Sequence, residues 1–150
     1  MKIINFTIKK FLAELKEDKK TNVEVMSNLN LEDIKETKIE PTDQQSVIIS
    51  FNFYVDYKPN VARIELKGHL ILLDDENKTK EIMNSWKSKK LPEEIQLPIL
   101  NFILEKCNIK ALEFEEKLGL PLHLPLPKIG ARKTQEKPES KEKKSASYAG

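Results

Sequence analysis

The chain has 150 residues, enough for one domain with a sizeable core and too few for two comfortable domains. Charged residues make up 33% of it, and charge-free stretches such as residues 95–104 and 118–127 fall short of the roughly 20 residues of a membrane-spanning helix. The formal net charge of +2 is the sum of two parts of opposite sign: residues 128–150 carry a net charge of +4, and residues 1–127 carry a net charge of −2.

The first 31 residues predict β-strands. Residues 2–12 are able to open a strand, although residues 9–20 also fit a short helix that ends in charged side chains. Residues 21–31 place Val23, Val25, Leu29 and Leu31 on one parity, an alternation typical of a half-buried strand.

The clearest strand covers residues 47–57, where apolar side chains alternate with polar ones. A turn signal over residues 41–43 precedes it. Residues 58–60 make a second turn, and residues 61–73 resume the alternation. Two strands joined by so short a link predict an antiparallel hairpin.

Beyond residue 79 the apolar period becomes that of helices. Residues 79–90 predict a short helix with Ile82, Met83 and Trp86 on one side. Residues 91–94 have the features of a helix start, but an interior Pro98 costs about 3 kcal/mol. We therefore expect the long helix to begin again near Pro98 and to run towards Leu118.

The long helix carries a broad apolar arc. Its main stripe consists of Leu97, Leu100, Leu104, Cys107 and Ala111, and further side chains widen it: Ile99, Phe102, Ile103 and Ile109. So wide an arc predicts two buried faces, one against the sheet and one against a partner. Among these residues, Ile99, Phe102 and Ile103 are the candidates for an oligomer interface.

The last part of the chain is not helical. Gly119 suits a helix C-cap, and the alternating leucines and prolines of residues 120–127 predict an extended strap. The lysine-rich segment 130–150 has almost no apolar side chains, which predicts disorder. The fold class is therefore α+β: residues 1–129 form one domain, with an antiparallel sheet of about four strands and a long C-terminal helix packed on one face.

The sequence lacks recognisable catalytic or metal-binding motifs. The four glycines stand too far apart for a phosphate loop or a serine nucleophile elbow. His69, Cys107 and His123 are scattered rather than set at metal-ligand spacing. The single cysteine excludes an intramolecular disulfide and fits a reducing compartment. We expect a cytoplasmic protein that is not an enzyme and that has no cofactor, no metal and no membrane span.

Aromatic side chains are the features left without an assigned role. Phe51, Phe53 and Tyr57 share one strand face, which favours a core position, whereas Tyr54 and Trp86 have polar neighbours. Aromatic side chains beside a sheet edge are able to accept an extended apolar peptide or to close a subunit interface.

The order of these parts resembles the protein-export chaperone SecB and its relatives. The resemblance runs from about Phe6 to Pro127, and three stretches carry it: residues 47–72, 97–108 and 120–127. The basic tail departs from the acidic, metal-binding tail of the bacterial export chaperone.

The resemblance implies an ATP-independent holdase that binds unfolded or nascent polypeptides in apolar grooves, assembled as a homotetramer from two dimers. The candidate client-binding residues are Phe51, Phe53, Tyr54, Tyr57, Trp86, Leu122 and Leu124. Export, antitoxin protection and general proteostasis remain open as roles. The alternative is a ribosome- or RNA-associated accessory protein, in which the lysine-rich tail supplies salt-sensitive, sequence-independent attraction.

Overall fold

The computed structural model describes residues 1–18 and 22–130. The elements, in chain order, are β1 (Lys2–Leu15), β2 (Glu24–Ile39), β3 (Gln44–Lys58), β4 (Ala62–Leu73), α1 (Glu76–Trp86) and α2 (Glu93–Lys117). Apart from Gly130, the predicted disordered tail lies outside the described residues, and so does the basis of the RNA-associated alternative.

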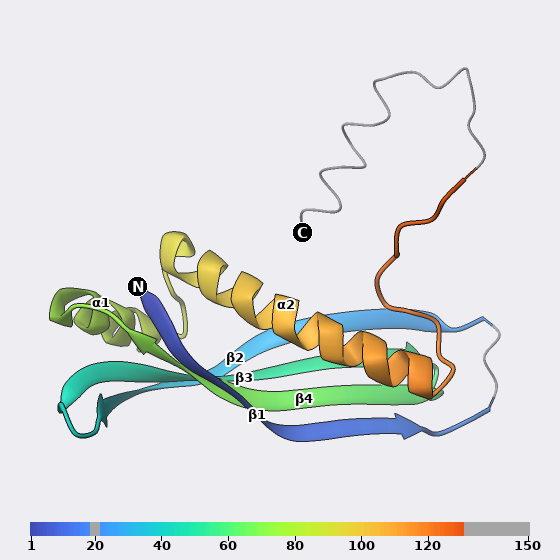
Figure 1. The fold of residues 1–150 in the computed structure, drawn as a ribbon, viewed down its shortest axis with the longest axis horizontal. Coiled ribbons are helices and arrows are strands. Elements are labelled where there is room, and N and C mark those ends of the chain that lie inside the picture. The colour runs from blue at the N-terminus through green and yellow to red at the C-terminus, as the bar shows by residue number, and fades with distance from the viewer. Residues whose placement is uncertain (19–21, 131–150) are drawn as a thin grey trace, which may run out of the picture.

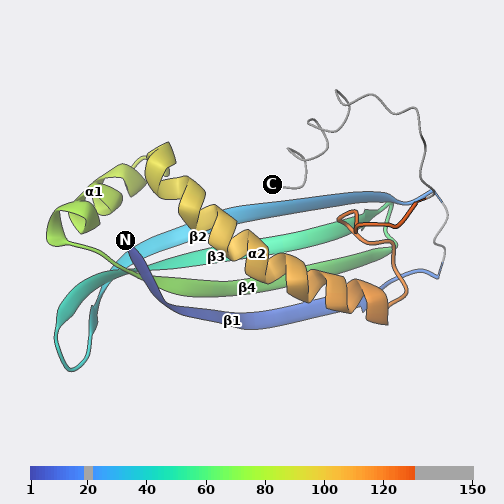
Figure 2. The same cartoon turned by 45° about the horizontal axis from the view of Figure 1, so that its top comes forward.

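The four strands form one antiparallel sheet in the order β1-β4-β3-β2. Consecutive hairpins join β2 to β3 and β3 to β4, and β1 pairs with the far side of β4. Strands β1 and β2 therefore lie at opposite edges. Helix α2 runs diagonally across one face of the sheet, and α1 lies over one end of it (Figures 1 and 2). This arrangement confirms the predicted α+β class with a long helix on one face.

Strand β1 runs as far as Leu15, so the alternative of a short helix over residues 9–20 is wrong for residues 9–15. The reason is tertiary, because these residues pair with β4, with Phe11 opposite Leu66. A register shift between Ile8 and Lys10 inserts one extra residue. The shift places Phe11 on the same face as Ile8, which a strict period of two would not do.

Strand β2 extends to Ile39, beyond the predicted end at residue 31. A register shift between Leu31 and Asp33 breaks the alternation there, and Ile34 then pairs with Ile49 on the covered face. The second half of the strand was not predicted from the alternation of side chains, because a bulge changes the parity of every later side chain.

Gly68 is the position at which β4 needs a residue without a side chain. A Cβ atom there would collide with the carbonyl oxygen of Thr7 and would lie 2.9 Å from the Cα of Ile8 and 3.0 Å from the ring of Phe51. Glycine therefore lets the irregular part of β1 approach β4 while Phe51 lies across it.

Helix α2 begins at Glu93, and the expected restart near Pro98 is wrong. Pro98 lies in the second turn, where its missing N–H removes one hydrogen bond to the carbonyl of Glu94. Both residues are exposed, so water is able to bond that carbonyl. The helix ends before Gly119, whose φ of 64° suits the left-handed position after a C-cap.

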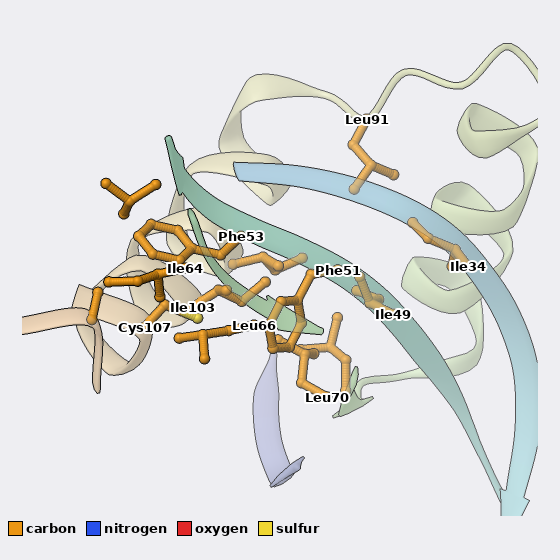
Figure 3. Packing of buried hydrophobic residues seen from close by; sticks show 14 of the residues in the cluster. Ile34, Ile49, Phe51, Phe53, Ile64, Leu66, Leu70, Leu91, Ile103 and Cys107 are labelled. Atoms are coloured by element: carbon orange, nitrogen blue, oxygen red, sulfur yellow. The ribbon is translucent and has the colours of Figure 1, made fainter. Parts of the chain in front are cut away.

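The core lies between the sheet and the two helices. On β3 and β4 one parity is buried beneath α2, as Phe51, Phe53, Ile64 and Leu66 illustrate. Figure 3 shows these side chains gathered with Ile103 and Cys107 of α2. We call this covered surface the inner face of the sheet and the opposite surface the outer face.

Candidate functional site

Helix α2 is buried on one face only. The buried side chains recur every four residues: Ile95, Ile99, Ile103, Cys107, Ala111 and Glu115. Away from this stripe, Leu97 and Ile109 are 48% and 54% exposed. Exposed apolar side chains that border a groove commonly mark an interaction surface, so the flanks of α2 are the candidate functional site.

The first flank forms a groove with β1, which we call the β1–α2 groove. Its volume is about 330 Å³, and it is lined by Phe6, Ile8, Phe11, Lys106, Ile109 and Lys110. Two of these apolar side chains are strongly exposed, Phe11 at 51% and Ile109 at 54%. The bulge in β1 is what brings Phe11 onto this face.

Aromatic contacts hold the walls of the β1–α2 groove in place. The ring of Phe6 stacks on Phe51 with centroids 5.3 Å apart and meets Phe102 edge-on at 5.6 Å. Phe11 meets Phe114 edge-on at 6.1 Å. These ring pairs join β1 to β3 and to α2, so the groove exists before any ligand arrives.

Strand β1 adds backbone groups to the same site. It is an edge strand, and within the described chain its strand partner is β4 alone. Its other edge therefore presents N–H and C=O groups with the spacing of a β-ladder. An extended peptide is able to pair with such an edge while alternate side chains enter an adjoining pocket.

The second flank of α2 forms a groove with the strap, residues 120–127, and we call it the strap groove. Its volume is about 480 Å³, and it is lined by Asn101, Leu104, Glu105, Asn108, Ile109, Leu112 and Leu124. Ile109 borders both grooves, so the two sites lie on either side of one exposed ridge of α2.

A buried polar cluster fixes the strap against α2. Nδ1 of His123 lies 2.7 Å from Oε2 of Glu115, and the backbone N–H of His123 donates to Oε1 of the same carboxylate at 3.0 Å. Nε2 of His123 lies 2.9 Å from Oδ1 of Asn108. The side chains of His123 and Glu115 are 1% and 0% exposed. A buried carboxylate with this many partners is a structural clamp.

Tyr57 fastens the strap from the sheet. Its hydroxyl donates to the carbonyl oxygen of Pro121 at 2.6 Å. Burial, reinforced by the charge of Glu115 and a hydrogen bond to it, raises the pKa of Tyr57 above its ordinary value. The phenol therefore stays protonated and remains a donor.

The predicted client-binding residues do not form one surface. Phe51, Phe53 and Tyr57 are core side chains, each at most 1% exposed, because α2 covers their face of β3. Trp86 is buried at the end of α1. None of the four lines the β1–α2 groove or the strap groove, so neither groove supports their predicted contact with clients.

The remaining three candidates lie apart from one another. Tyr54 is on the outer face, where the Arg63 guanidinium lies 4.5 Å from its ring centroid and Asn28 Nδ2 donates to its hydroxyl at 3.2 Å. Leu122 is an exposed strap residue, whereas Leu124 lines the strap groove. Of the seven candidates, only Leu124 therefore lines either groove.

The predicted oligomer-interface residues need a similar correction. Ile99 and Ile103 are fully buried against the sheet of their own chain, since they lie on the four-residue stripe. Phe102 is half-buried beneath the β1–α2 groove, against Phe6. On the exposed side of α2, Leu97 and Ile109 are separated by the exposed polar residues Asn101 and Glu105.

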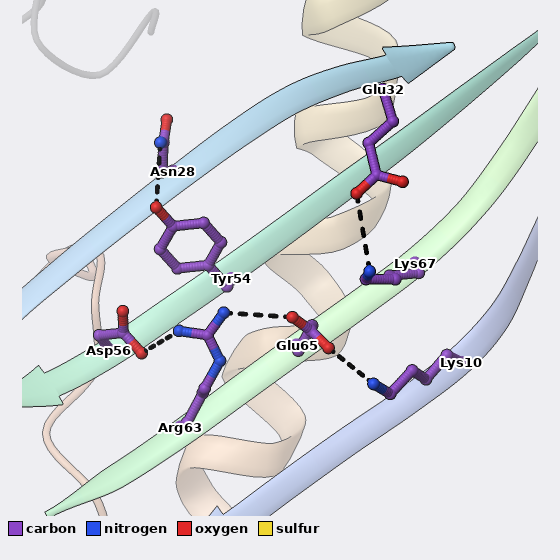
Figure 4. A network of polar contacts seen from close by, with 8 residues as sticks. All are labelled: Lys10, Asn28, Glu32, Tyr54, Asp56, Arg63, Glu65 and Lys67. Atoms are coloured by element: carbon purple, nitrogen blue, oxygen red, sulfur yellow. Dashed lines mark hydrogen bonds and ion pairs between the residues drawn. The ribbon is translucent and has the colours of Figure 1, made fainter. Parts of the chain in front are cut away.

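The outer face of the sheet carries a network of compensated charges (Figure 4). Lys10 Nζ lies 2.9 Å from Glu65 Oε1, and Arg63 contacts both Glu65 and Asp56. The hydrogen bond from Lys10, helped by Arg63, lowers the pKa of Glu65 in spite of its burial. Because these charges are paired with one another, the outer face is a weaker candidate for an apolar ligand than the inner-face grooves.

Within residues 1–18 and 22–130, no group of three or more His, Cys, Asp or Glu side chains is placed to hold a metal ion. In the same part of the chain, no helix has the length and apolar character needed to cross a membrane.

Comparison with known proteins gives likenesses to solved structures. No family model matches the sequence, and no curated protein matches it. Among solved structures, the chain is similar to a SecB-like chaperone of Mycobacterium tuberculosis in complex with a ChAD peptide from the HigA1 antitoxin. The two share 12% identity over 86% of this chain and 89% of that one, with a TM-score of 0.52. The likeness establishes a shared fold.

Proposed function

We propose that this protein is an ATP-independent holdase that binds extended apolar segments of non-native polypeptides in the β1–α2 groove. The observation that carries the proposal is the exposed pair Phe11 and Ile109 over a preformed aromatic floor, beside the free edge of β1. Such a site offers a client chain both backbone pairing and apolar pockets.

Holding without ATP requires only differential binding. A surface that binds unfolded chains and not folded ones lowers the concentration of free aggregating chains by mass action. The Mycobacterium tuberculosis protein of the same fold was solved with a bound peptide, which supports a polypeptide as the ligand class.

The proposal includes self-association as a homotetramer, which the resemblance to SecB implies. Leu97, which lines neither groove, supplies exposed apolar surface on α2 for such an assembly. Light scattering on the purified protein tests this part, because a tetramer has four times the 17.4 kDa mass of the chain.

Aggregation suppression tests the holdase activity. A thermally unfolding enzyme such as citrate synthase is followed by light scattering with equimolar holdase. We expect the wild type to suppress aggregation and Phe11→Ser/Ile109→Ser to lose most of that effect. The matched control is Met26→Ser/Ile129→Ser, which removes two exposed apolar side chains that lie outside α2 and line neither groove. Equal suppression by both double variants, or none by the wild type, contradicts the proposal.

A further inference from the structure

The polar groups at the β1–α2 groove are of one charge sign. Of its six lining residues the two that carry charge are Lys106 and Lys110, one helical turn apart on α2. Within the described chain Lys106 forms no ion pair closer than 4.0 Å, and its Nζ lies 5.5 Å from the ring centroid of Phe102. Lys110 Nζ lies 3.7 Å from Glu113, with both side chains about half exposed.

The strap groove differs in its charge. The one charged residue that lines it is Glu105, accompanied by Asn101 and Asn108. The two grooves share Ile109, but the strap groove is the more polar of the two and its charged residue is negative, so polarity and charge sign both distinguish them. A ligand that binds one groove in preference to the other through this charge difference carries charged groups next to its apolar segment.

We propose that the β1–α2 groove selects polypeptide segments in which apolar or aromatic residues are flanked by Asp or Glu. This inference rests on the proposed holdase function and names its ligand class. The apolar segment occupies the surface of Phe6, Phe11 and Ile109, and the flanking carboxylates pair with Lys106 and Lys110. Segments flanked by lysine or arginine meet like charges at the same rim and are disfavoured.

The expected size of the preference follows from the exposure of the rim. Exposed ion pairs contribute little individually, so two of them predict about three- to tenfold tighter binding of an acidic-flanked segment. Because salt screens these pairs, the preference shrinks as ionic strength rises, whereas the apolar part of the affinity does not.

Fluorescence anisotropy with two labelled peptides tests the proposal. Both contain the same core, Phe-Leu-Ile-Phe, flanked on each side by two glutamates or by two lysines. The wild type is expected to bind the glutamate-flanked peptide about three- to tenfold more tightly at low salt. Lys106→Glu/Lys110→Glu is expected to reverse the order. Lys38→Glu/Lys90→Glu, with the same change in net charge at two exposed lysines outside the groove, is expected to keep it. Circular dichroism and urea midpoints check that both variants are folded.

The other outcomes separate the two proposals. Equal affinity for both peptides in the wild type, together with aggregation suppression, overturns the acidic preference and leaves the holdase function standing. Failure of both peptides to bind, with no suppression, overturns both proposals. A second copy of this chain is a different possible occupant of the groove. In that case the Lys106→Glu/Lys110→Glu variant has a different solution mass from the wild type and neither peptide binds the wild type, which overturns the inference.

A nucleic acid is a further possible occupant, tested by anisotropy with a labelled single-stranded oligonucleotide. If the wild type binds the oligonucleotide and the Lys106→Glu/Lys110→Glu variant does not, the inference is also overturned.

Discussion

Nδ1 of His123 lies 2.7 Å from Oε2 of Glu115, and this buried contact fastens residues 120–127 to the C-terminal part of α2. The strap in turn supplies Leu124 to one wall of the strap groove. The geometry of that groove therefore depends on a polar contact that no solvent reaches.

Removal of the carboxylate is expected to destabilise the fold strongly. Glu115→Ala leaves the imidazole and the backbone N–H of His123 buried without their acceptor, which costs about 3–5 kcal/mol of unfolding free energy. Urea unfolding measures the loss, and the amide of His123 should exchange hydrogen faster. The control is Glu116→Ala at the neighbouring exposed position, expected to change stability by less than about 0.5 kcal/mol. Equal stability of the two variants contradicts the clamp.

Gly68→Ala is expected to destabilise the sheet beside β1. The added Cβ meets the Thr7 carbonyl and the Phe51 ring, and neither can move without disturbing the core. Overpacking of this kind costs about 1–3 kcal/mol. Gly130→Ala is the matched control, because a Cβ there has no heavy atom within 4 Å. A urea midpoint for Gly68→Ala at or above that of the control would show that the strand can shift freely.

Phe51 and Phe11 are both aromatic strand residues of the inner face, yet their truncation should differ in effect. Phe51→Ala creates a cavity beneath α2 and is expected to cost about 3–5 kcal/mol. Phe11→Ala removes a half-exposed ring and should cost about 1 kcal/mol or less while reducing client binding. Urea unfolding and aggregation suppression, measured on both variants, check this contrast. The opposite ranking of stabilities contradicts the assignment of Phe51 to the core and of Phe11 to the groove.

The thiol of Cys107 is expected to be unreactive in the folded protein. Burial raises its pKa to about 12, and the side chain is fully covered by the sheet. Ellman's reagent at about pH 8 should therefore label it only as the chain unfolds, whereas a free cysteine with a pKa of about 8.5 reacts readily. Labelling in guanidinium chloride provides the control. Rapid stoichiometric labelling of the native protein would mean that α2 leaves the sheet frequently.

Acid should weaken the outer face through Glu65. Its pKa is lowered in the fold by the hydrogen bond from Lys10 and by Arg63, against the effect of burial. A lowered folded-state pKa stabilises the protein above the unfolded-state value and loses that contribution as pH falls through the folded value. Glu65→Gln should therefore lose less unfolding free energy than the wild type between about pH 7 and about pH 3. Parallel pH profiles of the two proteins contradict this.

The sequence by itself determined the class of the fold. Alternating side chains located β3 and β4, and apolar residues at helical spacing located α2 from about Pro98 onward, because both patterns arise from local backbone geometry. The predicted main stripe nevertheless included Leu97, which is exposed, and the buried stripe contains Ile95, Ile99 and Ile103 instead. The leucine and proline alternation over residues 120–127 likewise excluded a helix. The sequence has no closely spaced glycines and no metal-ligand spacing, so it lacks the patterns of phosphate loops and metal sites, and its apolar side chains are the remaining candidate functional feature.

Only the tertiary structure decided which apolar side chains are covered. A period of two tells that Phe51, Phe53 and Tyr57 share a face, but not that a helix some 50 residues later lies across it. The bulge in β1 that brings Phe11 to the groove is set by pairing with β4, at Gly68 and Lys67. The core and the exposed β1–α2 groove are both lined by apolar side chains, so the physical difference between them is a long-range contact that local pattern does not encode.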